Sequence, residues 1–437
     1  MGSLGTGLVS PATTPPRQVD TIDTLVDTIK SCFYFLRHDA SLQNEQQKAV
    51  NESKGPSKTE NGFRESLNAR TRLVQACRLL INALEGPTET SKNMALVDKH
   101  SLVSLQTINH YRIAELVPAN GDISIEALAD KVKLPADTLA RILRQAMTYQ
   151  VFREPRNGYI SHTVTSMEIP RLEPLLTYQL EVCLPSSLGL IRWLKQGQED
   201  AIKSPFQVAH HTEDSWWEYA GKRPSLIQGY GRYMELITNG GPHDVSHVVR
   251  GFAWESLGEA LVVDIGGANG FVSVMLADAF PSLTLMIQDS TNLQEVADAT
   301  IPAHLKGRVT FTPHSFFEPQ KSTSRGADIF LLRHILHDWA DEDCITILRQ
   351  LTQCLKPGAS IIVAEQVMSM PGAVDRERER VMRALDMQMM VQFGGKERTL
   401  EDWEGLFQRA DESLEMVGVV KPDGSADSLI QLKKSSE

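Results

Sequence analysis

Residues 261–270, LVVDIGGANG, decide the fold class of this 437-residue chain. The segment begins with a short apolar, β-branched run, which predicts a strand buried on both faces of a parallel sheet. Gly266, Gly267 and Gly270 follow at once, and glycine allows a sharp turn and a close approach of the backbone to a ligand. The next residues, FVSVMLADAF, carry apolar side chains at helical spacing. The chain therefore contains a strand that leads through a glycine loop into a helix.

A second predicted strand, LTLMIQD, ends at Asp289. An acidic residue at this place can accept hydrogen bonds from ribose hydroxyls. The loop does not follow the GxGxxG pattern, and it lacks the Lys-Ser/Thr ending of a phosphate-binding loop. The two strands predict half of a Rossmann unit that holds a nucleotide-like cofactor. The alternative is an ordinary turn between a strand and a helix.

A histidine and an aspartate follow the next apolar segment, ADIFLLRHIL, which spans residues 327–336 and predicts another buried strand. Ligands of open α/β sheets bind outside the carboxyl ends of the strands, which is where His337 and Asp338 fall. A histidine with a pKa near ~6.5 can take a proton at neutral pH. The other histidines of interest are interpreted as capping or packed core residues: His210, His211, His314 and His334.

Two glutamates complete this candidate site. Glu365 ends the predicted strand SIIVAEQV, and Glu397 lies in the turn FGGKERT before the predicted helix LEDWEGLFQRA. A carboxylate bonded to one imidazole nitrogen fixes the tautomer and stabilises the imidazolium. Either glutamate alone would be read as a solvated surface charge. Together with His337 they are predicted to be the catalytic residues.

Five separated motifs resemble those of a known family. In order they are DIGGANG, QDS, RHILHDW, AEQ and GGKERT. They resemble the class I small-molecule O-methyltransferases of plant caffeate and flavonoid type, most of all the fungal branch that includes the sterigmatocystin O-methyltransferases. The resemblance covers about residues 65–434. It implies an α/β fold, with a Rossmann-like methyltransferase domain and an N-terminal α-helical winged-helix dimerisation domain, and S-adenosylmethionine as the cofactor.

The resemblance also implies which residues hold this cofactor, which has no phosphate and needs no phosphate-binding lysine. Asp289 would bind the ribose and Arg333 would lie against the adenine. Two departures from the family occur, because Ala268 replaces a glycine and Ser315 replaces an aspartate, which removes one hydrogen bond to the cofactor. The full set of expected cofactor-binding residues is Asp264, Gly266, Gly267, Asp289, Ser315, Phe316 and Arg333.

The acceptor substrate is expected to contact Asp338, Met234 and Gln392. Met234 lies in a region rich in aromatic residues, 171–240, and Gln392 follows a methionine-rich helix predicted at 382–391. Methionine adapts to flat rings. The alternative for these side chains is plain core packing.

Composition restricts the partners and the compartment. A net charge of −11 argues against nucleic acid or an anionic membrane as the main partner. The five cysteines form no CxxC or zinc pattern, which favours a reducing compartment and no metal. With no long apolar span and no signal core, a cytoplasmic protein is expected. Gly2 and Thr6 match the myristoylation pattern, although chance explains so short a match.

The chain is expected to contain a disordered tail (1–18), a helical and winged-helix dimerisation domain (19–165), a helical connector that lines the substrate (166–245) and the methyltransferase domain (246–437). Helices are predicted at 24–36, 66–85, 123–132 and 134–147, with a polar loop at 44–62 and a hairpin at 151–162. A winged helix raises DNA binding, but its second helix offers only Arg141 and Arg144. The N-terminal helices have more apolar surface than one small domain buries, which predicts a homodimer.

The sequence therefore predicts an S-adenosylmethionine-dependent O-methyltransferase that acts on a phenolic hydroxyl of an aromatic polyketide-like metabolite. Two alternatives remain. One is a cofactor-bound pericyclase on the same fold, a group that often replaces the histidine retained here as His337. The other is a winged-helix regulator with a vestigial methyltransferase domain.

Overall fold

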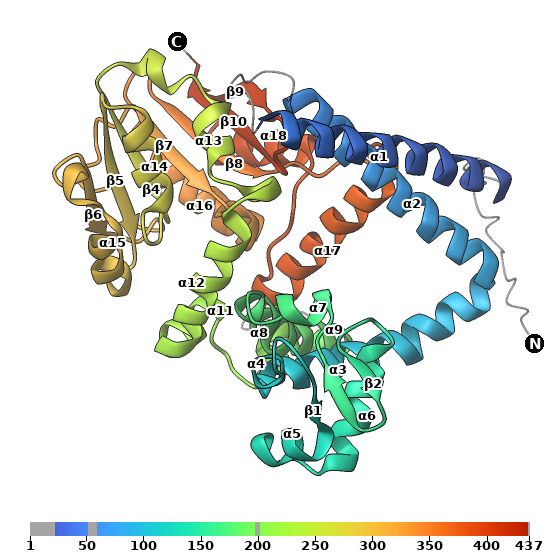
Figure 1. Cartoon of the computed structure of the whole chain (residues 1–437). Helices are drawn as coiled ribbons and strands as arrows, with labels where there is room; N and C mark the ends of the chain where they lie inside the picture. The colour runs from blue at the N-terminus through green and yellow to red at the C-terminus, as the bar shows by residue number, and fades with distance from the viewer. Residues whose placement is uncertain (1–21, 51–58, 197–201, 436–437) are drawn as a thin grey trace, which may run out of the picture. The chain divides into compact units, whose positions relative to one another are not determined.

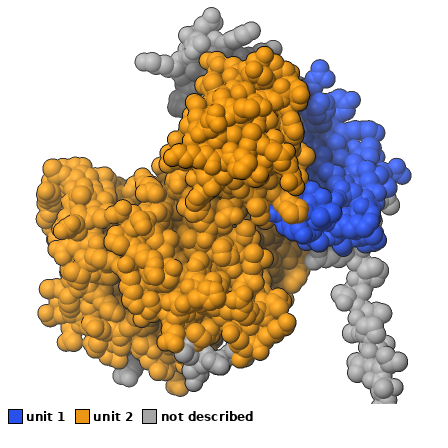
Figure 2. All heavy atoms as spheres, turned by 90° about the horizontal axis from the view of Figure 1, so that it is seen from below, with its two compact units in different colours: residues 1–99 blue, residues 100–437 orange. Residues whose placement is uncertain are grey.

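The computed structural model describes residues 22–50, 59–196 and 202–435 (Figure 1). Backbone contacts divide the chain into two compact units, residues 1–99 and 100–437, which Figure 2 colours separately. The expected tail at 1–18 and the Gly2 acylation pattern lie outside the described residues. The domain limits at 165 and 245 stay predictions.

The first unit is helical. Its elements are α1 (Ile22–Val50), α2 (Thr59–Lys92) and a π-helix, η1 (Asn93–Asp98). The polar loop expected at 44–62 is wrong at both ends, because residues 44–50 continue α1 and residues 59–62 begin α2. Gln, Glu, Lys and Ala are good helix formers, so a polar composition does not exclude a helix. α2 is interrupted at Gly86, with φ 72° and ψ 171°, immediately after the predicted helix ends.

The second unit starts with small helices around a three-stranded sheet of order β1-β3-β2. The helices and the hairpin predicted here are confirmed, and Gly158 forms the turn with φ 78°. Ser124 caps α5 by accepting a hydrogen bond from the backbone of Ala127 at 3.1 Å. The elements are α3 (Lys99–His110), α4 (Ile113–Leu116), β1 (Ile123–Ser124), α5 (Ile125–Val132), α6 (Ala136–Met147), β2 (Arg153–Arg156) and β3 (Tyr159–Ser161).

Helices follow as far as residue 257, as expected for residues 171–240. They bury a cluster of aromatic side chains that includes Tyr178, Phe206, Trp216 and Tyr233. The elements are α7 (Val164–Glu168), α8 (Glu173–Thr177), η2 (Tyr178–Cys183), α9 (Leu184–Gln196), α10 (Pro205–Ala209), α11 (Trp216–Gly221), α12 (Pro224–Thr238), η3 (Gly241–His243), α13 (Ser246–Gly251) and η4 (Trp254–Leu257).

A seven-stranded sheet of order β6-β5-β4-β7-β8-β10-β9 organises the rest of the second unit. The first five strands of this order are parallel, and β10 runs antiparallel to both β8 and β9. The predicted strand 327–336 is too long, because His334 has a left-handed backbone (φ 53°) that ends β7 at Arg333. The strands are β4 (Ala260–Ile265), β5 (Leu283–Asp289), β6 (Val309–Pro313), β7 (Ile329–Arg333), β8 (Ser360–Gln366), β9 (Leu414–Val420) and β10 (Asp427–Lys434).

Both faces of the central strands β4, β7 and β8 are buried. Along β7, Phe330 and Leu332 belong to the hydrophobic cluster with α16 and α18, whereas Ile329 and Leu331 belong to the cluster with α14. Such an alternation explains the continuous apolar run of the strand. The helices are α14 (Phe271–Ala279), η5 (Thr291–Leu293), α15 (Gln294–Thr300), η6 (Ala303–Leu305), η7 (Leu336–Asp338), α16 (Asp341–Thr352), α17 (Arg376–Phe393) and α18 (Leu400–Ala410).

The strand order reverses at β4, which has β5 on one side and β7 on the other. In open α/β sheets this reversal leaves a crevice at the carboxyl ends of the strands, where ligands bind. The predicted glycine loop and His337 both follow strands at this edge. Within the described ranges, no helix has the length and apolar character needed to cross a bilayer.

Candidate active site

The glycine loop folds tightly over the ends of β4 and β5. The backbone N–H groups of Gly266 and Gly267 both donate to the carbonyl of Gln288, at 2.8 and 3.3 Å. A Cβ on Gly267 would lie 2.8 Å from the carboxyl carbon of Asp264, so no larger residue fits here without movement. Ala268, at the place of the family's glycine, has φ 48°, a left-handed conformation that favours glycine.

Two acidic residues hold this loop. Asp264 is buried and accepts a hydrogen bond from Ser273 Oγ at 2.7 Å, which ties it to α14. Burial raises the pKa of Asp264 to about 6. Asp289 accepts from the backbone N–H of Ala268 at 2.9 Å and of Ser290 at 2.7 Å. Oδ1 also accepts from Ser290 Oγ at 3.2 Å, whereas Oδ2 accepts the single bond from Ala268 and can accept another, since a carboxylate oxygen has two lone pairs.

Of the other expected cofactor-binding residues, one lies against the glycine loop and two are hydrogen-bonded to other parts of the protein. Phe316 lies beside the loop, because a Cβ on Gly266 would be 3.7 Å from its ring. Ser315 Oγ accepts a hydrogen bond from the backbone N–H of Phe317 at 3.3 Å, which stabilises the turn that contains both residues. Arg333 is mostly buried, and its Nη2 donates to the carbonyl of His243 at 2.6 Å.

Gln288 was not considered in the sequence analysis, and His314 was interpreted as a capping or packed core residue, but both have buried polar atoms without a partner. Gln288 Oε1 and both ring nitrogens of His314 are buried without a hydrogen-bond partner. His314 lies at the end of β5, since its backbone donates to the carbonyl of Asp289 at 2.9 Å. Buried polar atoms normally have partners, so this edge offers hydrogen bonds to a bound molecule or to water. The only sequence signal was their position at the carboxyl ends of β5 and β6.

His337 lies in η7 and is brought together with both predicted glutamates. Its Nδ1 is 3.0 Å from Glu397 Oε1 and 3.5 Å from Glu365 Oε2. Glu365 is fully buried, and its Oε1 accepts from the backbone N–H groups of Ile335 and Leu336, each at 2.9 Å. The acid nearest to Nε2 is Asp338, with Oδ1 at 3.6 Å. When the ring is neutral, Nδ1 would carry the proton that Glu397 accepts, and the lone pair would then lie on Nε2.

The charges around His337 favour its protonated form. Burial alone would lower the pKa of His337, but the carboxylates of Glu365, Glu397 and Asp338 raise it well above its usual value. Burial raises the pKa of Glu365 and of Asp338 to about 7, and in both cases His337 opposes that rise. The cluster can therefore take up a proton and stabilise the imidazolium that forms.

The turn at residues 394–398 packs closely against the loop that carries His337 and is hydrogen-bonded to it. The backbone of Lys396 donates to the carbonyl of His337 at 3.0 Å. A Cβ on Gly395 would collide with that carbonyl oxygen and would lie 2.6 Å from the carbonyl carbon of Asp338. Only glycine permits this close approach.

Arg398 is fully buried and also binds the loop that carries His337. Its Nη1 donates to the carbonyl of Leu336 and its Nη2 to that of Trp339, both at 2.9 Å, so it spans His337 on either side. Its Nη2 also pairs with Asp341 at 2.8 Å. The roles of Gly395 and Arg398 were missed by the sequence analysis, although both stand in the GGKERT motif.

The predicted acceptor residues lie near an aromatic cluster. Burial, and next the charge of Asp338, raise the pKa of Tyr230 well above its usual value, so Asp338 lies close to this ring. Met234 packs on the cluster, as does Phe393. Gln392 is fully buried, and neither its Nε2 nor its Oε1 has a partner. The same is true of three further polar atoms in the cluster: Tyr178 OH, Trp216 Nε1 and Trp217 Nε1.

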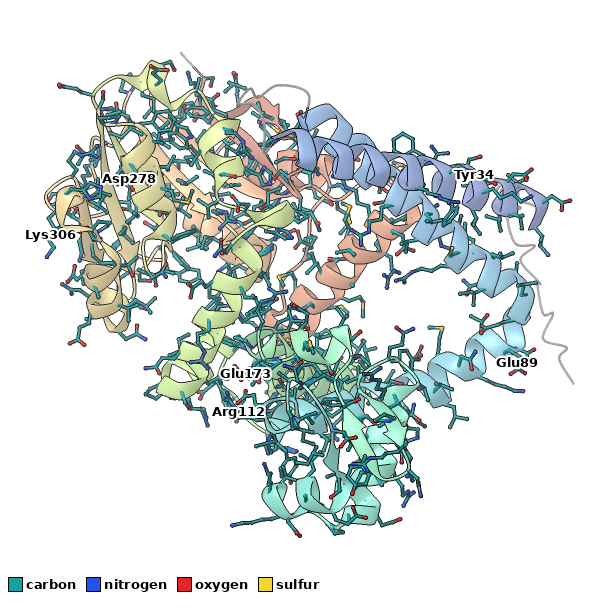
Figure 3. All side chains as sticks on the ribbon, viewed as in Figure 1. Tyr34, Glu89, Arg112, Glu173, Asp278 and Lys306 are labelled. Atoms are coloured by element: carbon teal, nitrogen blue, oxygen red, sulfur yellow. The ribbon has the colours of Figure 1, made fainter. Side chains whose placement is uncertain are left out.

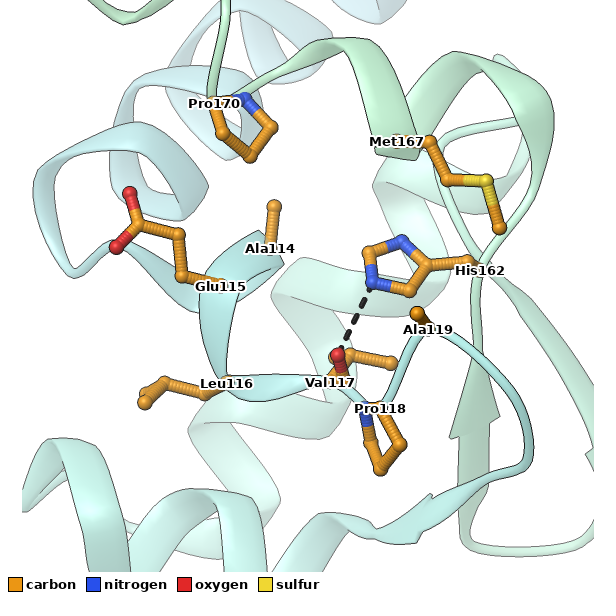
Figure 4. A pocket seen from close by; sticks show the side chains of 9 residues that line it. All are labelled: Ala114, Glu115, Leu116, Val117, Pro118, Ala119, His162, Met167 and Pro170. Atoms are coloured by element: carbon orange, nitrogen blue, oxygen red, sulfur yellow. Dashed lines mark hydrogen bonds between the residues drawn. The ribbon is translucent and has the colours of Figure 1, made fainter.

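A hollow of about 430 Å³ elsewhere in the second unit is not connected with these residues (Figure 4). It is lined by residues between Ala114 and Pro170, and none of the predicted site residues is among them. Its one titratable ring, His162, is already hydrogen-bonded through both nitrogens, to Ser166 at 2.8 Å and to the carbonyl of Val117 at 3.1 Å.

Comparison with known proteins agrees with this geometry. The family model for an O-methyltransferase domain matches residues 189–411. O-methyltransferase aoiO from Aspergillus oryzae is 56% identical over 367 residues, which cover 84% of this chain and 91% of that relative. The crystal structure of OxaC in complex with sinefungin and meleagrin has a TM-score of 0.73 at 18% identity, covering 92% of this chain and 99% of that one. A structure described as "A Pericyclic Reaction enzyme" has a TM-score of 0.69 at 21% identity, and the match covers 91% of this chain and 99% of that one.

Proposed function

The chain belongs to the O-methyltransferase family, and from that premise we propose that it methylates a phenolic hydroxyl of an aromatic, polyketide-like metabolite with His337 as the general base. Its similarity to these relatives identifies it as an S-adenosylmethionine-dependent O-methyltransferase of secondary metabolism. The acceptor class and the role of each residue are the proposal. The observation that carries it is the Nδ1 to Glu397 distance of 3.0 Å, which assigns the proton of the neutral imidazole to Nδ1 and so directs Nε2 to accept the proton of the acceptor.

The residues at the glycine loop suit a nucleoside without phosphates. Asp289 would accept hydrogen bonds from the ribose hydroxyls, and Phe316 would lie against the adenine. His314 and Gln288 add buried polar atoms that lack partners. Arg333 would serve the site indirectly, because its guanidinium is bonded to the carbonyl of His243.

His337 would accept the phenolic proton at Nε2, while Glu397 and Glu365 stabilise the imidazolium. A phenol has a pKa near ~10, so a positioned base is needed at neutral pH. The cofactor supplies an electrophilic methyl group as its sulfonium. The protein holds the hydroxyl in line, a geometric contribution worth several powers of ten in rate.

The aromatic cluster around Trp216 and Tyr230 would hold the flat acceptor, with Met234 against the ring system. Tyr178 OH and Trp216 Nε1 lack partners. They would serve carbonyl or hydroxyl oxygens of the acceptor, as would Gln392. Such a set of apolar walls with a few polar atoms is typical of small-molecule sites.

We also propose that the protein is a homodimer in the cytoplasm. The first unit exposes large apolar side chains, among them Phe33, Tyr34, Ile81 and Leu84, and Figure 3 shows Tyr34 projecting from α1. Apolar surface of this extent on one element pair usually marks an interface. All five cysteines are free, which suits a reducing compartment.

Incubation of candidate phenolic polyketides with methyl-labelled cofactor, followed by mass spectrometry, tests the function. Transfer of one labelled methyl group to oxygen is expected. His337→Gln should lower turnover by ~10²–10⁴-fold, the range for a general base. The matched control is His304→Gln, because His304 forms an exposed pair with Asp278 at 2.7 Å and neither residue belongs to the proposed site (Figure 3 labels Asp278). An isomerised product without a mass gain would instead support the pericyclase alternative.

A further inference from the structure

His334 was interpreted from the sequence as an ordinary packed histidine, but its surroundings are unusual. It follows the last residue of β7 and adopts φ 53°, while its backbone N–H still donates to the carbonyl of Ala364 at 3.2 Å. Because of this left-handed residue, the chain turns and both Ile335 and Leu336 can donate to Glu365. A non-glycine residue in this conformation is strained by ~1–3 kcal/mol unless the surroundings hold it.

Asp427 holds the side chain of His334. Its Oδ2 lies 2.8 Å from His334 Nε2. Asp427 is itself buried at the start of β10, where it pairs with Gln366 of β8 and its backbone donates to Ser425 Oγ at 3.0 Å. The carboxylate therefore belongs to the rigid sheet, and the ring of His334 cannot turn without breaking this bond.

The fixed ring of His334 lies against the base. The rings of His334 and His337 are stacked, with centroids 5.5 Å apart and planes inclined by 23°. Glu397 and Glu365 contact His337 through Nδ1 and so set its orientation within the ring plane. A stacked ring restricts a second movement of His337, the tilt of its ring plane. Among the described residues that contact His337, His334 is the one that stacks on its face.

His334 is suited to lie beside an imidazolium. Burial lowers the pKa of His334 to about 4, against the opposing effect of Asp427. Its ring is therefore neutral at pH 7, and a neutral ring face attracts a cation where a charged ring would repel it. The charged groups that act on this ring are Asp427, Arg333 and His337.

A metal site is the competing explanation, because ligand atoms of His243, His334 and Asp427 all lie within 4.8 Å of one another. The distance of 2.8 Å between Nε2 and Oδ2 is that of a direct hydrogen bond. The buried guanidinium of Arg333 also interacts with Asp427, and it would repel a divalent cation. The hydrogen-bonded arrangement accounts better for these contacts.

We propose that His334, held by Asp427, is a positioning residue that fixes the plane in which His337 presents Nε2 to the acceptor hydroxyl. The proposal rests on the proposed role of His337 as the base. A base misplaced by about 1 Å can lose ~10²-fold in rate, so a residue that only holds the ring has a large effect on turnover.

The test compares His334→Ala, which removes the ring, with His334→Phe, which restores a flat neutral face. Expected for His334→Ala is a 10- to 100-fold fall in kcat (about the loss for a misplaced group), with an unchanged KM for S-adenosylmethionine. His334→Phe should recover part of that loss. His304→Ala serves as the matched control, because its exposed pair with Asp278 lies outside the site. Asp427→Asn, which keeps the shape of the carboxylate, should lower kcat in the same direction if His334→Ala does not fold.

The double variant His334→Ala/His337→Gln separates positioning from any other role. If His334 acts only through His337, the first change should have almost no further effect on kcat once the base is gone. Additive losses would overturn the proposal, as would full turnover of His334→Ala. Stoichiometric bound metal that is needed for activity would also overturn it. A wild-type rate in His337→Gln alone would instead refute the proposed function.

Discussion

Gly395→Ala is the substitution for which the structure gives the most direct consequence. The added methyl group would collide with the carbonyl oxygen of His337 and come within 2.6 Å of the carbonyl carbon of Asp338. An ordinary contact of a Cβ atom is 3.4–4 Å, so the turn at 394–398 must move away from the His337 loop. Both neighbours are backbone atoms, which cannot rotate aside as a side chain would.

The required movement is about 1 Å, and a misplacement of that size costs ~10²-fold in rate. Glu397 lies two residues further along the same turn and would lose its 3.0 Å contact with His337 Nδ1. Overpacking of this kind also destabilises the fold, by about 1–3 kcal/mol. We therefore expect kcat to fall by ~10²-fold while the protein remains folded.

The assay is steady-state methyl transfer together with a thermal melt. Gly405→Ala in α18 is the matched control, because a Cβ there meets no atom within 4 Å and the helix should gain stability. S-adenosylhomocysteine affinity should stay unchanged in both variants, because none of the expected cofactor-binding residues lies in the turn at 394–398 or in α18. If Gly395→Ala turned over at the wild-type rate, the close approach of the two loops would have no role in catalysis.

The remaining predictions concern the cofactor, the pH profile and the dimer. Asp289→Ala should weaken S-adenosylhomocysteine binding by about 1–3 kcal/mol in calorimetry; an unchanged dissociation constant would mean that Asp289 only anchors the loop. Glu397→Gln removes a carboxylate that raises the pKa of His337. Less charge lowers that pKa, so the rise of kcat/KM with pH should begin at lower pH, and a shift to higher pH would contradict the assignment. Light scattering should give about twice the chain mass of 48.6 kDa, and deletion of residues 1–99 should reduce dimerisation and activity together. A fully active monomer at micromolar concentration would exclude the dimer.

Sequence patterns predicted the elements of the sheet because their signals are local. The apolar runs at 261–265 and 360–366 are strands buried on both faces, and the run at 283–289 is a strand in which Thr284 is exposed; continuous apolar runs indicate such strands. The end of β7 was misplaced, since the left-handed turn at His334 depends on Asp427, which lies far along the chain. The helix α1 was predicted too short, because its polar second half has no apolar stripe.

The sequence predicted the titratable residues of the site, but not the residues that hold the His337 loop in place. His337, Glu365 and Glu397 belong to separate segments, and the structure brings both glutamates within 3.5 Å of His337 Nδ1. Gly395 and Arg398 act on backbone atoms of another loop, and no spacing in the sequence encodes that contact. Interactions between a side chain and a distant carbonyl become visible only in three dimensions.

The origin of the side chains around the site has a consequence for how such an enzyme diversifies. His337 and Glu365 come from the ends of sheet strands, whereas the aromatic cluster comes from η2, α10, α11 and α12 and from the end of α17. Substitutions in these helices would alter the space offered to an acceptor and leave the proton-accepting group in place. Recognition and reactivity could then evolve, or be engineered, as separate modules. Libraries for new acceptors should accordingly vary Trp217, Tyr230 and Met234 while the sheet edge is kept constant.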